Sequence, residues 1–198
     1  MSSPAEQPGL RERKKARTRA AIQRHALRLF SEQGYDATTV SQIAEAAEIS
    51  ESTFFRYFAT KEAVVLWDDL DPLLVAAVRA QPPGSSPVQV LRAAFHDVFA
   101  QLPAAQLAGE RARLALVLSV PELRSTMLEQ LGDAMRQVAQ LVAEREGRRP
   151  DDFAVRALAG AVVGVSMAAL FAAAEDPEAD LIALLDRAMA QLEAGLPI

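Results

Sequence analysis

The segment STFFRYF, residues 52–58, places four aromatic side chains, one arginine and two small hydroxyls within two helical turns. The whole chain of 198 residues holds only eight Phe, two Tyr and one Trp. On a helix, Phe54 and Phe58 are i, i+4 neighbours on one face, so we expect both to be buried. The surface then keeps Ser52, Thr53, Phe55, Arg56 and Tyr57. A guanidinium, hydroxyls and exposed rings bind partners by hydrogen bonds and apolar contact, so the segment predicts a recognition surface.

Residues suited to catalysis are scarce. The two histidines, His25 and His96, lie far apart in the sequence, and the chain has no cysteine. The sequence shows no glycine-rich phosphate loop and no histidine and carboxylate cluster at metal-ligand spacing. We therefore expect no enzyme, no metal site and no cofactor. Since disulfides are excluded and no signal peptide is visible at the N-terminus, we expect a cytoplasmic protein.

The charge is unevenly distributed. The net charge is −5, yet residues 10–30 hold eight Lys or Arg and only Glu12 as an acid. A basic N-terminal part on an acidic remainder favours a polyanionic partner for that end alone. A solvated charged tail is the alternative interpretation.

Periodicity and composition predict an all-α protein of about nine helices without strands. Gly34 stops the first helix, Thr39 and Ser50 are placed to cap the second and third, and Pro87 opens a later one. The expected helices include 17–33, about 51–58, 61 to roughly 81, 104–119 and 121–146. Others open at Val40 after the Thr39 cap, at Pro87 and at Pro177, and one contains the apolar run 157–174. We expect a flexible basic arm at 1–16, one helical domain at 17–60 and a second at 61–198.

An uncharged run at 157–174 approaches the length of a membrane span. More than half of it is Ala, Gly or Ser, which gain little from lipid. We expect a buried helix here rather than a span, and no membrane partner.

Two short helices separated by a tight turn, with a first helix to brace them, have the spacing of a helix-turn-helix motif. The second helix of such a pair can enter a DNA major groove. The residues RHALRLFSEQGY, TTVSQIAEAA and ISESTFFRYFATKEAVV follow one another in register. In this order they resemble the TetR family of bacterial transcriptional regulators, from about Thr18 to Val65.

The resemblance implies roles for individual residues. Thr39, Tyr57 and Lys61 would contact phosphates, with Lys61 as a point charge. Ser52, Thr53, Phe55 and Arg56 would face the groove, where Arg56 could read guanine. Arg17 and Arg19 lie where the family often has a basic arm. The predicted DNA-binding residues are Arg17, Arg19, Thr39, Ser50, Ser52, Thr53, Phe55, Arg56, Tyr57 and Lys61.

Two positions depart from the family pattern. Glu48 stands in the turn where glycine is usual, so a left-handed backbone there would cost roughly 1 kcal/mol. Glu51 places a carboxylate near the bases, where it would repel phosphate, accept from cytosine or complement the helix dipole.

A single helix-turn-helix reads few bases, so we expect a homodimer on a palindromic operator. The last two helices are the candidate interface, with an intramolecular core as the alternative. The predicted interface residues are Gly160, Gly164, Leu181, Leu184, Leu185, Met189 and Leu192.

In this family the central helices enclose a small-molecule cavity. The predicted lining is Trp67, Phe95, Phe99, Met127, Leu131, Met167 and Phe171, although side chains of this kind are individually more often core than ligand contacts. Its apolar character favours a small hydrophobic or acyl-bearing effector. The stretches DDLDPLLVAAVRAQPP and VLSVPELR also look like actinobacterial members with an acyl-CoA-like ligand domain.

We therefore expect a repressor that its effector releases from DNA. A single helix from Lys61 to about Gln81, kinked at Pro72, would join the cavity to the DNA module. The alternative is an adaptor of the same fold that binds a protein through the aromatic and basic surface.

Overall fold

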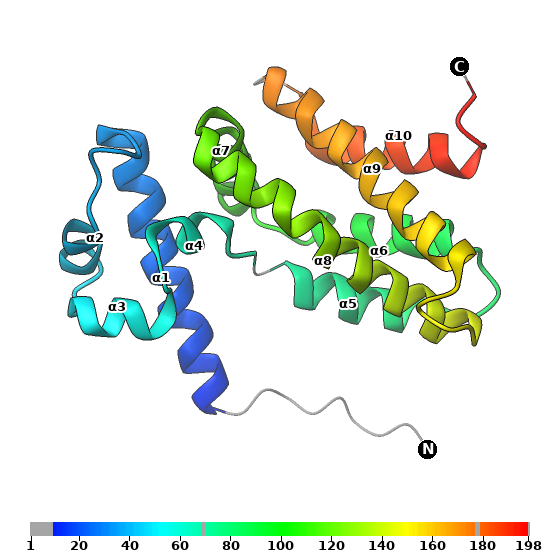
Figure 1. Ribbon diagram of the computed structural model, residues 1–198, viewed down its shortest axis with the longest axis horizontal. Coiled ribbons are helices and arrows are strands. Elements are labelled where there is room, and N and C mark those ends of the chain that lie inside the picture. The colour runs from blue at the N-terminus through cyan, green and yellow to red at the C-terminus, as the bar shows by residue number, and fades with distance from the viewer. Residues whose placement is uncertain (1–9, 69, 177–178, 198) are drawn as a thin grey trace. The chain divides into compact units, whose positions relative to one another are not determined.

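The computed structural model describes residues 10–68, 70–176 and 179–197, which form ten α-helices and no strands (Figure 1). The all-α prediction is confirmed. The helices are α1 (Leu10–Gln33), α2 (Val40–Ala46), α3 (Glu51–Tyr57), α4 (Lys61–Leu66), α5 (Asp71–Ala80), α6 (Pro87–Ala100), α7 (Ala104–Ser119), α8 (Pro121–Glu146), α9 (Phe153–Glu175) and α10 (Leu181–Glu193). They form two compact units, Met1–Trp67 and Asp68–Ile198, and each is described separately.

The first unit is built around α1, which contacts α2 and α4, while α2 contacts α3. Its buried side chains include Ile22, Ala26 and Phe30 from α1 and Ile43 from α2. The long helix α1 begins at Leu10, so residues 10–16 are helical and the expected flexible arm is wrong for this part. No proline or glycine interrupts the sequence between Leu10 and Gln33, which explains the extension. Residues 1–9 of the expected arm lie outside the described residues.

Side-chain caps fix the starts of the short helices. The Oγ1 of Thr39 accepts from the backbone N–H of Gln42, whose side chain accepts in return from the N–H of Thr39. The Oγ of Ser50 accepts from the N–H of Thr53, and Thr60 caps α4 in the same way. Both expected caps are therefore present, and each satisfies a backbone donor that a helix start leaves without a partner.

The expected single helix over 61–81 is wrong: α4 ends at Leu66 and α5 begins at Asp71. Trp67 is extended, and the carboxylate of Asp68 accepts from the N–H of Leu70 at 2.8 Å. Pro72 has no N–H to donate to the carbonyl of residue 68, so a continuous helix would lack a bond there. Instead Pro72 lies in the first turn of α5, where no donor is required.

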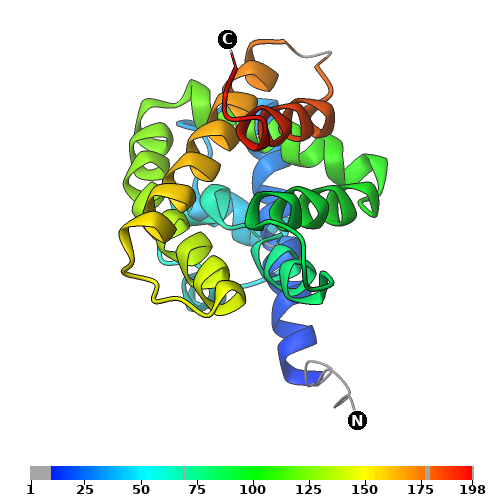
Figure 2. The same ribbon diagram turned by 90° about the vertical axis from the view of Figure 1, so that its right-hand side faces the viewer.

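The second unit contains α5 to α10. Two apolar clusters form its core, and residues of α6, α9 and α10 contribute to both. Helices α9 and α10, orange and red, lie side by side in both views (Figures 1 and 2). Among the described residues, α9 is the one helix long and apolar enough to be a candidate span. Its contacts with α8 and α10 bury Val155, Ala159 and Val162, but only 22% of the apolar window is buried in the chain, so the expectation of a buried helix is not met within a single chain.

Candidate nucleic-acid interface

Two phenylalanine rings hold α3 in place. Phe54 is fully buried and Phe58 is 4% exposed, and their ring centroids lie 6.1 Å apart. The ring of Phe58 also meets the ring of Trp67 edge-on at 5.9 Å. A helix of seven residues is unstable alone, so this burial must supply what its hydrogen bonds cannot. The prediction that Phe54 and Phe58 are core residues is confirmed.

The opposite side of α3 faces solvent. Phe55 is 52% exposed, with its ring edge against that of Phe54. Ser52 and Arg56 are exposed, and Thr53 and Tyr57 are partly exposed. The guanidinium carbon of Arg56 lies 5.6 Å from the centroid of the Tyr57 ring, and no carboxylate of the described residues pairs with Arg56. The helix therefore presents one arginine, one phenyl ring and small hydroxyls together.

The polar residues at the two helix starts already serve as caps. Thr39 is exposed at the start of α2, where its hydroxyl satisfies a backbone donor. The Oγ of Ser50 lies 2.9 Å from the hydroxyls of both Ser52 and Thr53. This arrangement orders the hydroxyl groups at the start of α3 into one network.

Lys61 is not the free point charge that was expected. Its ammonium donates to the carbonyl oxygens of Tyr35 at 2.8 Å and Thr38 at 3.2 Å, and it lies 4.1 Å from the centroid of the Tyr35 ring. The hydroxyl of Tyr35 donates in turn to Glu62 at 2.8 Å. Lys61 thus ties the start of α4 to the segment between α1 and α2. From the start of a helix, the three N–H donors of a lysine can reach several backbone carbonyls. Those carbonyls take up donors that would otherwise be available to a DNA phosphate.

The pKa of Glu62 reflects the same cluster. Burial raises it, but hydrogen bonds from its own N–H, from Thr60 and from Tyr35 together outweigh burial. The pKa of this carboxyl therefore lies below its usual range, and Glu62 is ionised beside Lys61.

Gln23 is a positioning residue that the sequence prediction missed. Its side chain is 8% exposed, and its Nε2 donates to the carbonyl oxygens of Val64 at 2.9 Å and Trp67 at 2.8 Å. These are carbonyls at the end of α4, which have no partner within the helix. A polar residue beside Ile22, on the apolar side of α1, was the available signal.

Glu48 adopts φ 54° in the turn between α2 and α3. Its N–H donates to Glu45, and the N–H of Ile49 donates to Ala44. The left-handed conformation is therefore fixed by the turn, and a side chain at this position costs roughly 1 kcal/mol relative to glycine.

Residues 22–66 match the sequence family described as "Bacterial regulatory proteins, tetR family". Residues 85–197, more than half of the chain, match the family described as "MftR C-terminal domain". The chain belongs to the TetR family. Its helix-turn-helix module makes it a DNA-binding transcriptional regulator.

Curated TetR relatives support this assignment. The chain is 40% identical over 152 residues to the HTH-type transcriptional regulator TcmR of Streptomyces glaucescens, covering 73% of this chain and 67% of that protein. It is 29% identical over 187 residues to the putative mycofactocin biosynthesis transcriptional regulator MftR of Mycobacterium tuberculosis, covering 93% of each. Both relatives are regulators from actinobacteria and neither is named as an enzyme.

Solved TetR-family structures share the fold. The repressor FadR of Thermus thermophilus, in complex with lauroyl-CoA, is 28% identical with a TM-score of 0.57, covering 91% of this chain and 95% of that one. FadR of Bacillus subtilis, in complex with stearoyl-CoA, has a TM-score of 0.60 at 21% identity, covering 90% and 99%. This second likeness shows the fold alone.

Six of the seven predicted effector-binding residues lie on α6, α8 and α9 of the second unit, and Trp67 belongs to the first unit. The rings of Phe95 and Phe99 on α6 stack at 6.2 Å and pack against side chains of α10. Phe171 is 39% exposed. Met127, Leu131 and Met167 are partly exposed on α8 and α9. One cavity lined by all seven stays a prediction.

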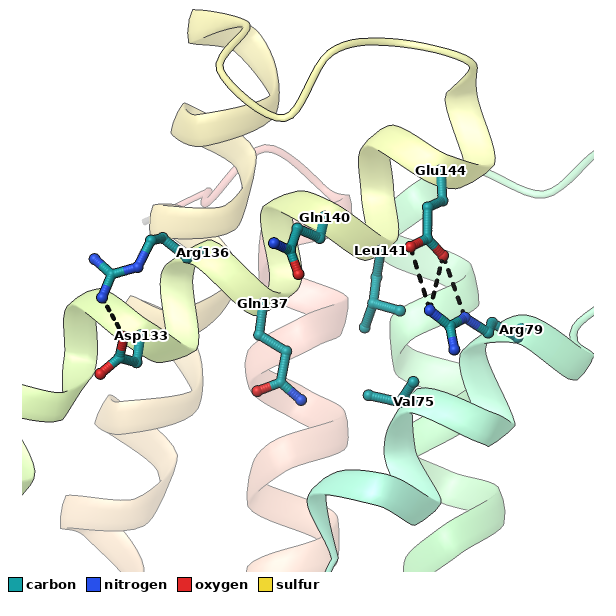
Figure 3. Close-up of a pocket in the computed structure, with 8 residues that line it drawn as sticks. All are labelled: Val75, Arg79, Asp133, Arg136, Gln137, Gln140, Leu141 and Glu144. Atoms are coloured by element: carbon teal, nitrogen blue, oxygen red, sulfur yellow. Dashed lines mark hydrogen bonds and ion pairs between the residues drawn. The ribbon is translucent and has the colours of Figure 1, made fainter.

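A separate hollow of about 490 Å³ lies between α5 and α8 (Figure 3). Val75 and Leu141 supply its apolar part, whereas Arg79 is held by Glu144 through both carboxylate oxygens. Arg136, at the other end, pairs with Asp133. Since both arginines are already paired, this polar surface differs from the apolar cavity expected for an effector.

Several predicted interface residues are core residues of the single chain. Leu181, Leu185 and Met189 are at most 4% exposed, and Leu184 and Leu192 pack against the same clusters. The assignment to a dimer surface is wrong for Leu181, Leu185 and Met189, which the chain itself buries, whereas for the partly exposed Leu184 and Leu192 it stays a prediction. Gly160 and Gly164 differ, since a Cβ placed on either would meet no atom within 4 Å.

Proposed function

We propose that this TetR-family regulator is a homodimeric repressor that binds a palindromic operator and is released by a small hydrophobic or acyl-bearing effector. The observation that carries the proposal is the division of α3, with Phe54 and Phe58 buried and Phe55 and Arg56 turned to solvent. This arrangement lets a short, anchored helix place its outer side chains in a major groove.

Arg56 would read guanine through its two-pronged guanidinium, and Phe55 or the methyl of Thr53 would touch a thymine methyl. Tyr57 and Thr39 would contact phosphates and set the register of the helix. Arg17 and Arg19 are two positions apart on α1 and therefore project in different directions. Arg19 is the stronger candidate of the two, because its Nε is buried and has no hydrogen-bond partner.

The exposed face of α9 is the proposed dimer surface. Ala157, Gly164 and Ala168 are exposed, and Gly160 and Ala161 are partly exposed on the same side of the helix. Small side chains allow the backbones of two helices to approach closely, which supports an interface between two copies of α9. Phe153 and Phe171, 83% and 39% exposed, lie toward the two ends of this face.

For the effector, the second unit offers unpaired polar atoms beside apolar side chains. The Oγ of Ser166 and the Nε of Arg111 are buried without a hydrogen-bond partner. Such atoms are costly unless a ligand or water completes them. Met127, Leu131 and Met167 remain the adaptable apolar candidates. The lauroyl-CoA bound by a relative with 28% identity supports an acyl-bearing molecule.

Release would act through the connection between the units. Because α4 is tied to α1 and α5 is a separate helix, the proposed joint follows Trp67 rather than lying at a kink at Pro72. An effector that changes the spacing of the two α3 helices from the ~34 Å repeat of a duplex would weaken binding. A hundredfold release requires a preference of about 2.7 kcal/mol for the mismatched dimer.

The test begins with selection of bound sequences from random duplexes by the full chain. The expected product is a palindrome with half-sites one helical turn apart. Lauroyl-CoA then serves as the probe effector, and it should lower the affinity for the selected duplex about a hundredfold. If no preferred sequence were recovered, the proposal of a specific operator would be contradicted. Duplex affinity that varies little with salt concentration would point to a protein-binding adaptor.

A further inference from the structure

The helix-turn-helix segment of this protein is poorly suited to attract a polyanion. Residues 36–60 carry Asp36, Glu45, Glu48 and Glu51 against Arg56, a net charge of −3. Lys61, the next cation, donates to backbone carbonyls of its own unit. If this unit binds DNA, most of the electrostatic attraction must come from another part of it.

The cations are concentrated on the first part of α1. Residues 10–24 carry seven Lys or Arg and one Glu, a net charge of +6. Residues 10–21 precede the part of the chain that matches the family of TetR regulatory proteins. In this protein these residues are not a loose arm, since they continue α1 as one helix (Figure 1).

The spacing of the cations gives the extension a direction. Arg11, Lys15 and Arg19 follow one another at intervals of four, and Ile22, Ala26 and Phe30 continue the series at intervals of three and four. These six residues form one stripe along α1. Its second half is buried in the module, whereas Arg11 and Lys15 are exposed. The side of α1 that packs on the module therefore continues beyond it as a row of cations.

Among the side chains that the structure describes, no carboxylate pairs with Arg11, Lys15 or Arg19. The Nε of Arg19 is buried without a hydrogen-bond partner, although Arg19 as a whole is partly exposed. The chain thus leaves one guanidinium incompletely bonded at the point where the basic part of the stripe meets the buried part.

We propose that the stripe Arg11, Lys15 and Arg19 is a rigid phosphate-binding arm, which supplies most of the electrostatic affinity that α2 and α3 lack. The inference depends on the proposed DNA-binding function. Residues 10–19 span about 15 Å as a helix, and a duplex presents a phosphate charge about every 1.7 Å along its axis. The arm lies along the backbone flanking the groove that α3 occupies, and it contacts phosphate without reading bases.

The experiment compares the full chain with the triple variant Arg11→Gln, Lys15→Gln, Arg19→Gln on a random-sequence duplex of about three helical turns. Affinity is measured by fluorescence anisotropy over a range of salt concentrations. Each lost phosphate contact should reduce the slope of log affinity against log salt by about 0.9, or about 2.7 per protomer in total. Base preference in a selection experiment should stay unchanged.

Arg24→Gln is the matched control. Arg24 is exposed on the opposite side of α1, so its loss removes one charge without touching the stripe. A second variant, Arg11→Lys with Arg19→Lys, keeps the charges and should keep the slope. Circular dichroism checks that the triple variant remains as helical as the wild type, which glutamine should allow.

The outcomes separate the two proposals. If the wild type binds duplex with a steep salt dependence and the triple variant has the same slope, the arm does not exist, while the DNA-binding function stands. An equal loss from Arg24→Gln would show only an effect of net charge and would also overturn the arm. If the wild type does not bind duplex at all, the proposed function itself fails.

Discussion

The Nε2 of Gln23 lies 2.8 Å from the carbonyl oxygen of Trp67, so a side chain of α1 holds the last residue of the DNA-binding unit. At the other end of α4, Lys61 donates to the carbonyl oxygens of Tyr35 and Thr38. The helix is therefore fixed to the module at both ends. The second unit begins at Asp68, whose carboxylate accepts from the N–H of Leu70.

Replacement of Gln23 by alanine should destabilise the first unit. The substitution leaves two carbonyl groups without their donor, which costs about 1–3 kcal/mol. Trp67 is the one tryptophan of the chain, so its fluorescence during urea unfolding reports on this unit. Gln130→Ala, at an exposed position of α8, should change stability by about 0.5 kcal/mol or less. Equal effects of the two variants would show that the Gln23 hydrogen bonds do not hold α4.

Glu48→Gly should stabilise the same unit by about 1 kcal/mol, since glycine adopts φ 54° without a Cβ clash. Glu48→Ala is the control, because it removes the carboxylate and keeps the Cβ. The gain should appear with glycine alone in thermal unfolding followed by fluorescence. If alanine stabilised equally, the carboxylate rather than the backbone would be the source of the strain.

The predictable part of the structure followed from local rules. Thr39 and Ser50 cap helices because their side chains reach donors two or three residues on, and Phe54 and Phe58 share a face by helical period. Glu48 was predictable in the same way, from the need for a left-handed residue in a short turn. Local spacing in the sequence was therefore enough to predict where α3 lies and which of its side chains face outward.

The residues whose roles were predicted wrongly take part in long-range packing. The stripe Leu181, Leu185 and Met189 shows that α10 has one apolar face, but its period does not say whether that face meets α6 and α9 or a second copy. The prediction of a free ammonium on Lys61 failed because its acceptors on Tyr35 and Thr38 lie more than twenty residues away in the sequence. Such choices are decided by the whole arrangement of helices.

The ion pair between α6 and α10 should give stability that depends on pH. Arg92 donates to both carboxylate oxygens of Asp186, at 2.6 and 2.8 Å, and this holds the pKa of Asp186 below its usual range. A lowered pKa in the folded state means that the stabilisation is complete above the unfolded pKa of about 3.9 and is lost as pH falls through the folded value.

Arg92→Met should therefore lower stability by about 1 kcal/mol or less near pH 6, since both side chains are partly exposed, and the difference should shrink below about pH 4. Urea unfolding followed by circular dichroism at several pH values measures it. Arg79→Met removes the more exposed pair with Glu144 and should have a smaller effect. A difference that grows on acidification would rule out the Arg92 and Asp186 pair as its cause.

Arg56→Ala should cost about 1–3 kcal/mol of binding on the selected duplex and relax the preference at one base pair in each half-site. The physical reason is that its guanidinium is exposed and unpaired by carboxylates of the described residues. Sequence selection with the variant measures the change. Arg28→Ala, which removes an arginine already paired with Glu32, should leave the preference intact. A variant at residue 56 with the wild-type preference would exclude Arg56 from base reading.

Gly164→Leu should weaken the dimer. Gly164 is exposed on α9 and a Cβ there meets no atom of the chain, so leucine can be accommodated in the monomer and improves helix propensity. Against a second α9 the added side chain would overpack the contact and cost about 1–3 kcal/mol, or about a 5- to 150-fold rise in the dimer dissociation constant. Sedimentation equilibrium measures this constant. Gly109→Leu, at a glycine of α7 that is equally open, should leave it unchanged. If both variants dimerise like the wild type, the interface lies on another face of the second unit.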